Sequence, residues 1–302
     1  MRSDNDNWEI DTGVGSTALF VAAARTLAGR EPDALAVDPL AEVFVRAAGG
    51  ELAVLIDGDP ELSKDHPLRT EEFGRPFREH QAGRTRYFDD YFHAACDSGI
   101  RQVVILAAGL DSRAYRLPFF EGVTVYELDR ATVLDFKRET LAAAGYSPLA
   151  DRREVAVDLR TDWLNTLQDS GFDAERPTAW LIEGLLIYIS PAAQDELFEI
   201  VAKASAPGSR VGIEQMTPFP ADVYEAITTV NEDEPEDGNW ARLIYNDPRS
   251  DAAQWFPGHG WNAERTELDD YLRAHGHAVP VGEDTGGFHP AAINLVTVQR
   301  PN

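Results

Sequence analysis

The chain has 302 residues, of which 43% are hydrophobic and 26% are charged, a balance typical of globular proteins. Its formal net charge of −25 argues against nucleic acid as a partner, because phosphate contacts need a surface rich in Lys and Arg. The sequence has no apolar run near the roughly 20 residues of a membrane-spanning helix, and its first ten residues are too polar for a signal peptide, which predicts a cytoplasmic protein without a membrane partner. The single cysteine excludes an internal disulfide, and the seven histidines lack metal-binding spacing, so no metal is expected.

Two helical patterns open the chain, over residues 16–28 and 39–48, with Gly29 and Pro39 as breakers between them. Residues 49–80 are rich in Gly, Pro and charge, which predicts an irregular, mobile connection. We therefore expect residues 1–83 to form N-terminal helices and a lid.

From residue 84 to residue 216 the predicted helices and strands alternate regularly. The predicted helices cover residues 85–97, 111–116, 131–143, 161–169 and 191–204, and the predicted strands cover residues 102–107, 123–128, 153–157, 178–183 and 209–215. Strands separated by helices indicate right-handed parallel crossovers, so this segment predicts a doubly wound α/β sheet with ligands at the carboxyl ends of its strands.

The pattern loosens after residue 216, where several prolines and aromatic residues occur. Residues 217–263 are expected to form an inserted helical cap, and its aromatic side chains are candidates to line an apolar cavity: Trp240, Trp255, Phe256 and Trp261. Residues 264–302 are expected to add a helix over 264–275 and a strand over 291–298 that complete the sheet.

Two strand–turn segments in this pattern carry the strongest functional signal. The strand before Gly109 is short, buried and β-branched, and the next strand closes on Asp129, 20 positions after that glycine. Gly109 allows the backbone to approach a ligand closely, and the carboxylate of Asp129 can accept both hydroxyl protons of a ribose. The two segments together are typical of an adenosine-binding α/β domain.

The turn after Gly109 indicates which adenosine cofactor is bound. A dinucleotide site needs glycines spaced GxGxxG, and the second and third glycines are absent here. A nicotinamide oxidoreductase is therefore disfavoured. Asp111 would repel a pyrophosphate, but it suits a ligand that carries an ammonium and a sulfonium. The residues thus predict S-adenosylmethionine as the cofactor.

Five ordered segments resemble the leucine carboxyl methyltransferase family, and in particular its bacterial branch of S-adenosylmethionine-dependent O-methyltransferases. They are RTRYFDDYF (84–92), VVILAAGLDSRAYRL (103–117), VYELD (125–129), VAVDLR (155–160) and WLIEGLLIYIS (180–190). The resemblance is collinear from about residue 10 to 215. It implies a class I methyltransferase fold, which is Rossmann-like and whose sheet ends in an antiparallel hairpin.

The resemblance also implies roles for individual residues. Gly109 matches the glycine beneath the methionine moiety, and Asp129 matches the acid that holds the ribose. Asp158 and Leu159 match the pair at the adenine edge, and Glu183 matches the acid near the cofactor's ammonium.

Other assignments stay open at the level of sequence. Either Arg84 or Arg86 corresponds to the arginine that binds the cofactor's carboxylate, and we favour Arg84. Asp111 either contacts the cofactor or caps the following turn. Asp129 could instead cap the helix that follows it, Asp158 could only start a turn, and Glu183 competes with Glu127 and Glu214 as the acid at a strand end. Arg113 and Arg116 are expected to pair with carboxylates rather than to touch substrate.

The expected reaction is O-methylation of a carboxylate or phenol in a small molecule, such as a natural product. A carboxylate is already ionised at neutral pH, whereas a phenol benefits from a base. His259 and His289 are candidate bases and Tyr188 a candidate orienting donor, although histidines in Gly/Pro-rich loops are usually solvated. The alternative function is a non-catalytic protein that senses S-adenosylmethionine.

Overall fold

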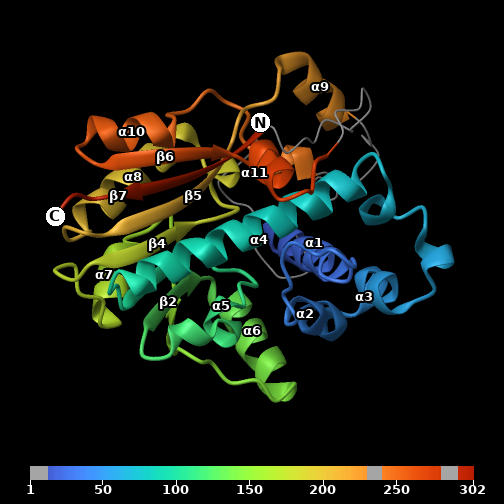
Figure 1. Cartoon of the computed structure of the whole chain (residues 1–302), viewed down its shortest axis with the longest axis horizontal. Helices are drawn as coiled ribbons and strands as arrows, with labels where there is room; N and C mark the ends of the chain where they lie inside the picture. Colours follow the sequence, from blue (N-terminus) through green and yellow to red (C-terminus); the bar gives the residue numbers. More distant parts are fainter. Residues whose placement is uncertain (1–12, 230–239, 280–291) are drawn as a thin grey trace.

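A single seven-stranded sheet forms the centre of the protein in a computed structural model that describes residues 13–229, 240–279 and 292–302 (Figure 1). Its strand order is β3-β2-β1-β4-β5-β7-β6. The first five strands run parallel, and β7 runs antiparallel to both of its neighbours. The strands are β1 (Gln102–Leu106), β2 (Thr124–Asp129), β3 (Asp151–Ala156), β4 (Thr178–Ile182), β5 (Arg210–Met216), β6 (Asn262–Glu267) and β7 (Ile293–Gln299).

Helices cover both faces of this sheet, as the alternation of strands and helices predicted. They are α1 (Gly13–Ala28), α2 (Ala41–Ala48), α3 (Gly50–Asp57), α4 (Gly74–Asp97), α5 (Arg113–Arg116), α6 (Ala131–Ala143), α7 (Trp163–Asp169), α8 (Pro191–Lys203), α9 (Ala221–Thr229), α10 (Ala252–Gly258) and α11 (Leu268–Ala274). Within the described ranges, no helix is both long and apolar enough to cross a membrane.

The alternation of side chains in β1 divides the core into two layers. Val103 and Ile105 belong to the cluster that contains Phe88 and Phe92 of α4, whereas Val104 and Leu106 belong to the cluster that contains residues of α7 and α8. All five residues of β1 are buried, because the central strand of a parallel sheet is covered on both faces. Because β1 pairs in parallel with β2 and β4, the carboxyl ends of these strands lie together at one edge of the sheet.

The prediction that residues 49–80 are irregular is wrong. They contain α3, the short 3₁₀ helices η1 (Pro60–Ser63) and η2 (Pro67–Arg69), and the first turns of α4. The hydroxyl of Thr70 accepts a hydrogen bond from the backbone N–H of Gly74 at 3.1 Å, which starts α4. A Cβ on Gly74 would lie 2.4 Å from the backbone of Leu68, so the glycine is needed for close packing and does not break the helix. The expected boundary between residues 83 and 84 consequently falls inside α4.

The C-terminal segment also differs from its prediction. Residues 262–267 form the edge strand β6, and the helix expected over 264–275 starts only at Leu268. β6 pairs along its length with β7, and this non-local pairing overrides the local helical pattern. The strand predicted over 291–298 corresponds to β7.

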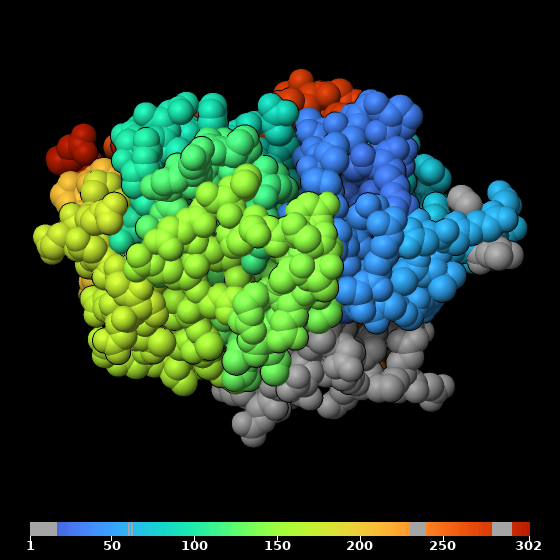
Figure 2. All heavy atoms as spheres, turned by 90° about the horizontal axis from the view of Figure 1, so that it is seen from below, coloured from blue at the N-terminus to red at the C-terminus, as the bar shows by residue number. Residues whose placement is uncertain are grey.

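The N-terminal helices pack against the α/β core. α1 lies against α2 and α4, and α2 lies against α6. Figure 2 shows the blue N-terminal segment directly beside the green segment that contains α6. The N-terminal helices therefore stand near the edge of the sheet at which ligands are expected.

A buried ion cluster links α6 to the sheet. The Lys137 ammonium lies 2.7 Å from a Glu127 carboxylate oxygen, and the Arg152 guanidinium lies 2.6 Å from the same oxygen. Lys137 also donates a hydrogen bond to the backbone carbonyl of Asp111 at 3.0 Å. The side chains of Lys137 and Glu127 are fully buried, so this cluster holds the turn after β1 against α6 without contact with water.

Replacement of Lys137 by Met is expected to lower the free energy of unfolding by about 3 kcal/mol, because breaking a buried ion pair leaves a charge without its partner. Arg138→Met is the matched control on the same helix, where the side chain is exposed, and it should change the stability little. Denaturant unfolding of the two variants measures the difference. Equal stability of both variants would contradict a structural role for the cluster.

Candidate functional site

Two adjoining cavities open at the carboxyl ends of the parallel strands. The first, which we call the Asp158 cavity, has a volume of about 560 Å³ and is lined by residues that include Arg130, Asp158 and Leu159. The second, the Gly109 cavity, has a volume of about 820 Å³. Both are lined by Ala107, Asp129, Leu185 and Tyr188, so they meet at these residues.

The turn after β1 has an unusual backbone where the cavities meet. Ala107 and Gly109 adopt left-handed conformations, with φ values of 51° and 45°. Such a conformation costs a residue with a Cβ on the order of 1 kcal/mol, and strain of this kind is concentrated at functional sites. A Cβ on Gly109 would approach other protein atoms only to 3.9 Å. The glycine therefore serves the backbone conformation and leaves its open side to the cavity.

Asp129 ties the ends of β1 and β2 together. Its Oδ2 accepts a hydrogen bond from the backbone N–H of Gly109 at 2.7 Å, and its Oδ1 accepts one from the N–H of Arg130 at 2.7 Å. Burial raises the pKa of this carboxyl group, and the two backbone N–H groups oppose that rise. Each carboxylate oxygen retains acceptor capacity. Asp129 does not cap α6, because the N-cap of that helix is Arg130, without a side-chain hydrogen bond. The carboxylate of Asp129 instead fixes the turn after β1 and lies in the wall of both cavities.

Asp158 and Leu159 line the Asp158 cavity next to the end of β3. The Asp158 carboxylate accepts hydrogen bonds from the Arg160 guanidinium, one of them at 2.7 Å, and lies 3.2 Å from the Arg130 guanidinium. The hydrogen bond from Arg160 lowers the pKa of Asp158. Its backbone carbonyl also accepts from Thr161 at 2.9 Å, so Asp158 both starts a turn and faces the cavity.

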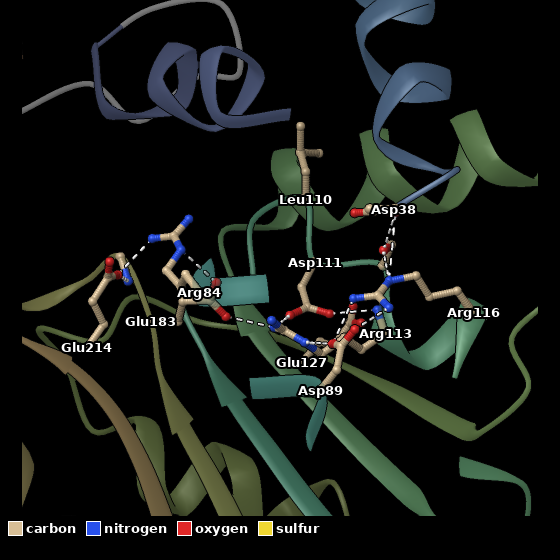
Figure 3. Close-up of polar contacts among 12 residues, drawn as sticks. Asp38, Arg84, Asp89, Leu110, Asp111, Arg113, Arg116, Glu127, Glu183 and Glu214 are labelled. Carbon is tan, nitrogen blue, oxygen red and sulfur yellow. Dashed lines mark hydrogen bonds and ion pairs between the residues drawn. The ribbon is translucent and has the colours of Figure 1, made fainter. Parts of the chain in front are cut away.

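Arg84 is the arginine that reaches the Gly109 cavity. Its guanidinium lies between Glu183, at 3.0 Å, and Glu214, at 2.7 Å (Figure 3). Burial would lower the pKa of Arg84, but the two carboxylates outweigh it and raise the value. Arg86 is exposed and pairs with Asp90 at 2.8 Å. Of the two arginines left open by the sequence, only Arg84 lines the cavity.

Arg113 continues this network towards the turn after β1. It contacts Asp111, lies 2.7 Å from Glu183 and lies 2.8 Å from Asp89 (Figure 3). Burial would raise the pKa of Asp111, but Arg113 and Lys137 outweigh it and lower the value. Asp111 accepts from the backbone N–H of Arg113 at 2.7 Å and also lines the cavity, so both readings of this residue fit its position.

A closed ring of hydrogen bonds in the same cavity was not anticipated from the sequence. His80 Nε2 lies 2.7 Å from Glu214, and Gln81 Nε2 lies 3.2 Å from His80 Nδ1. Arg84 donates to Gln81 Oε1 at 2.6 Å and to the other oxygen of Glu214, which completes the ring. No short motif joins His80 to Glu214, since 134 positions separate them.

Burial and charge set the protonation state of this ring. Burial lowers the pKa of His80 and outweighs the hydrogen bond and charge of Glu214, which act to raise it. Burial alone would raise the pKa of Glu214, but Arg84 and His80 hold it well below the usual range. The ring therefore contains a neutral imidazole and an ionised carboxylate near neutral pH.

The candidate catalytic residues occupy very different positions. Tyr188 is buried where the cavities meet, and its hydroxyl accepts a hydrogen bond from Trp240 Nε1 at 3.0 Å. Burial raises the pKa of Tyr188. His259 is exposed, stacks on Trp255 at 3.8 Å between ring centroids and lines neither cavity. His289 lies outside the described residues.

Of the four cap aromatics predicted to line a cavity, Trp240 does so, and Tyr245 of the same segment, which was not among them, lines the Asp158 cavity. Trp255, Phe256 and Trp261 pack instead with Phe198 of α8 on the layer that contains α7 and α8. The apolar wall that was predicted to come from the cap is formed instead by residues of the N-terminal helices, such as Phe20 and Phe77. In the described part of the chain, no group of three or more His, Cys, Asp or Glu side chains is arranged to hold a metal ion.

Glu214→Gln is expected to reduce stability most near neutral pH. The pKa of Glu214 is depressed in the folded protein, so its ionisation contributes stability above the unfolded pKa, and this contribution is lost as pH falls towards the folded value. The difference in unfolding free energy between wild type and variant should therefore shrink as pH falls below about 4.5. Glu225→Gln, at an exposed position of α9, is the control. A difference that does not depend on pH would refute this account, and denaturant unfolding from pH 3 to 7 measures it.

Comparison with known proteins agrees with this geometry. The family model of leucine carboxyl methyltransferases matches residues 18–202. A protein of Mycobacterium sp. (strain KMS), named an S-adenosyl-L-methionine-dependent methyltransferase, is 53% identical over 300 residues, which cover 99% of this chain and 100% of that protein. A protein of the same name from Mycobacteroides abscessus is also 53% identical, over 98% of this chain and 99% of its own length.

A solved structure of a methyltransferase from Thermobifida fusca has the same fold. It superposes with a TM-score of 0.51 and 15% sequence identity, over 93% of this chain and 94% of its own. The predicted class I methyltransferase fold and the predicted cofactor, S-adenosylmethionine, are confirmed. The chain belongs to the leucine carboxyl methyltransferase family and is an S-adenosylmethionine-dependent methyltransferase.

Proposed function

We propose that the protein transfers the methyl group of S-adenosylmethionine to a carboxylate or phenol oxygen of a small molecule. The observation that carries this proposal is the pair of cavities that meet at Asp129. One is lined by side chains suited to bind the nucleoside of the cofactor, and the other by side chains suited to bind its methionine moiety and the acceptor. The Asp158 cavity suits a nucleoside, and the larger Gly109 cavity has room for a methionine moiety and an acceptor.

The chemistry of the donor set fits this cofactor. Asp129 can accept from ribose hydroxyls, while Asp158 can accept from the exocyclic amine of adenine and Leu159 can pack against the ring. Gly109, Asp111 and Glu183 line the Gly109 cavity, where carboxylates favour an ammonium and a sulfonium. Arg84 supplies a buried cation for the cofactor's carboxylate. A dinucleotide, whose pyrophosphate is anionic, would not fit this acidic lining.

When bound, S-adenosylmethionine supplies a methyl group that an oxygen nucleophile displaces from sulfur in line. The protein's task is then to align the nucleophile and exclude water. The strained turn at Ala107 and Gly109, held by Asp129, provides a rigid wall at the junction of the cavities. Tyr188 stands at the same junction, where its hydroxyl can orient the reacting groups. A sensor without catalysis would not need the additional volume of the Gly109 cavity.

Asp129→Asn is expected to weaken binding of S-adenosylmethionine and S-adenosylhomocysteine about ten- to hundredfold, because a lost buried acceptor costs about 1–3 kcal/mol. The carboxyl group of Asp158 is less deeply buried than that of Asp129, so Asp158→Asn should have a smaller effect. Exposed Asp135→Asn on α6 is the control and should bind as wild type does. Calorimetric titration measures all three. Unchanged affinity in Asp129→Asn, with unfolding behaviour like wild type, would remove the ribose assignment.

Titration of wild type with S-adenosylmethionine, S-adenosylhomocysteine and NAD tests the site itself, and transfer of a labelled methyl group to small carboxylic acids and phenols tests the reaction. We expect binding of the first two ligands only, followed by methylation of oxygen. Transfer solely to nitrogen, sulfur or carbon acceptors would refute the proposed O-methylation while leaving the cofactor unaffected.

A further inference from the structure

Aromatic side chains from the N-terminal helices line the part of the Gly109 cavity that no cofactor role assigned above uses. Phe20 of α1, Phe73 directly before α4 and Phe77 of α4 form a cluster, with ring centroids 5.4 Å apart for Phe20–Phe77 and for Phe73–Phe77. The ring of His80 meets Phe77 edge to face at 5.9 Å. An apolar wall of this kind favours an apolar, planar acceptor, and it continues directly to the His80–Glu214 pair.

The charges around this cavity disfavour an anionic acceptor. Its described lining contains five carboxylates: Glu51, Asp111, Asp129, Glu183 and Glu214. The two arginines in that lining, Arg25 and Arg84, already contact acids or a carbonyl, since Arg25 donates to the carbonyl of Leu110 at 3.0 Å and lies 3.5 Å from Asp38. The cofactor's own carboxylate also requires a cation. A second carboxylate would therefore enter an acidic cavity without a cation to bind it.

The hydrogen-bond ring fixes the tautomer of His80. Ionised Glu214 can only accept, so the proton on the imidazole lies on Nε2, and Nδ1 carries a lone pair. Nδ1 accepts from the Gln81 amide in the present structure. Both residues line the cavity, so an acceptor hydroxyl can take the place of that amide.

We infer that the acceptor is a neutral phenol on an apolar molecule and that His80 is the base that receives its proton. This inference rests on the proposed O-methyl transfer. The phenol oxygen forms a bond to the methyl carbon, the carbon–sulfur bond breaks, and sulfur keeps the electron pair. The phenol proton moves to Nδ1 of His80, and the resulting imidazolium is stabilised by Glu214 before it returns the proton to water.

The electrostatic surroundings agree with that role. In the described part of the chain, Glu214 of β5, Glu183 after β4 and Arg84, one turn along α4, are charged groups that act on His80. Burial keeps the pKa of His80 below its ordinary value, so the imidazole is neutral and competent as a base at pH 7.

Two matched probes distinguish the acceptor classes: 4-hydroxybiphenyl and biphenyl-4-carboxylic acid, which differ only in the reacting group. We expect wild type to methylate the phenol and to bind it calorimetrically in the presence of S-adenosylhomocysteine, and to do neither with the acid. His80→Gln should lower kcat for 4-hydroxybiphenyl at least about 100-fold with little change in KM, as loss of a general base does. In the wild type, kcat should rise with pH as His80 loses its proton, and His80→Gln should abolish this rise on the acidic side of the pH profile.

A third probe separates a base from a merely structural residue. 3-Nitro-4-hydroxybiphenyl ionises more readily, so His80→Gln should lose much less activity on it than on 4-hydroxybiphenyl. Phe77→Leu is the control for the cavity wall, and it should raise KM for both phenols without altering the pH profile. Calorimetric binding of S-adenosylhomocysteine to every variant checks that the cofactor site is intact.

Three results would overturn the inference. They are methylation of the carboxylic acid in preference to the phenol, failure of the phenol to bind or react while the cofactor binds normally, and an equal loss in His80→Gln on both phenols. By contrast, failure of wild type to bind S-adenosylmethionine would count against the proposed function itself. Loss of cofactor binding in His80→Gln would likewise overturn the role of His80 as the base, because His80 would then position the cofactor site.

Discussion

The buried guanidinium of Arg84 is the central contact of the ion-pair network that surrounds the Gly109 cavity. Arg84 lies between Glu183, directly after β4, and Glu214, near the carboxyl end of β5, so it joins the carboxyl ends of two neighbouring strands to α4. A buried charge is tolerated only when it is fully paired, and the remaining members of the network follow from that requirement. Arg113 balances the second oxygen of Glu183, and Asp111 and Asp89 balance Arg113.

This electrostatic framework explains how one cavity combines acidic and apolar walls. Glu214 and Glu183 pair with Arg84 of α4 and Arg113 of α5, respectively. These two carboxylates therefore have cationic partners even without a bound ligand. The aromatic wall comes from separate elements, α1 and the first turns of α4. In the proposed assignment, the strand ends and Arg84 of α4 face the cofactor, whereas the aromatic wall beside the acceptor comes from α1 and the start of α4.

The sequence predicted those helices and strands that depend on the pattern of neighbouring residues. Buried β-branched runs predicted the parallel strands, and the bounds predicted for α6 agree with those observed. The start of α4 was mistaken for a loop because Gly74 and Pro76 resemble breakers, whereas one serves close packing and the other occupies the first turn. The edge strand β6 depends on β7, and the pairing of His80 with Glu214 depends on the folded sheet, so neither has a local signal.

The continuity of α4 has a consequence for how such a protein diversifies. Its 24 residues span about 36 Å as one rigid rod. The distal half is fixed to the sheet, where the Tyr91 hydroxyl donates to the carbonyl of Trp180 at 2.9 Å. At the other end, Phe73, directly before the helix, and Phe77, in its first turns, line the cavity. Substitutions at Phe73 and Phe77 can therefore reshape the cavity while Arg84, two turns further along, keeps α4 paired with the ends of β4 and β5. One continuous helix thus separates the residues that shape the cavity wall from those that hold the strand ends.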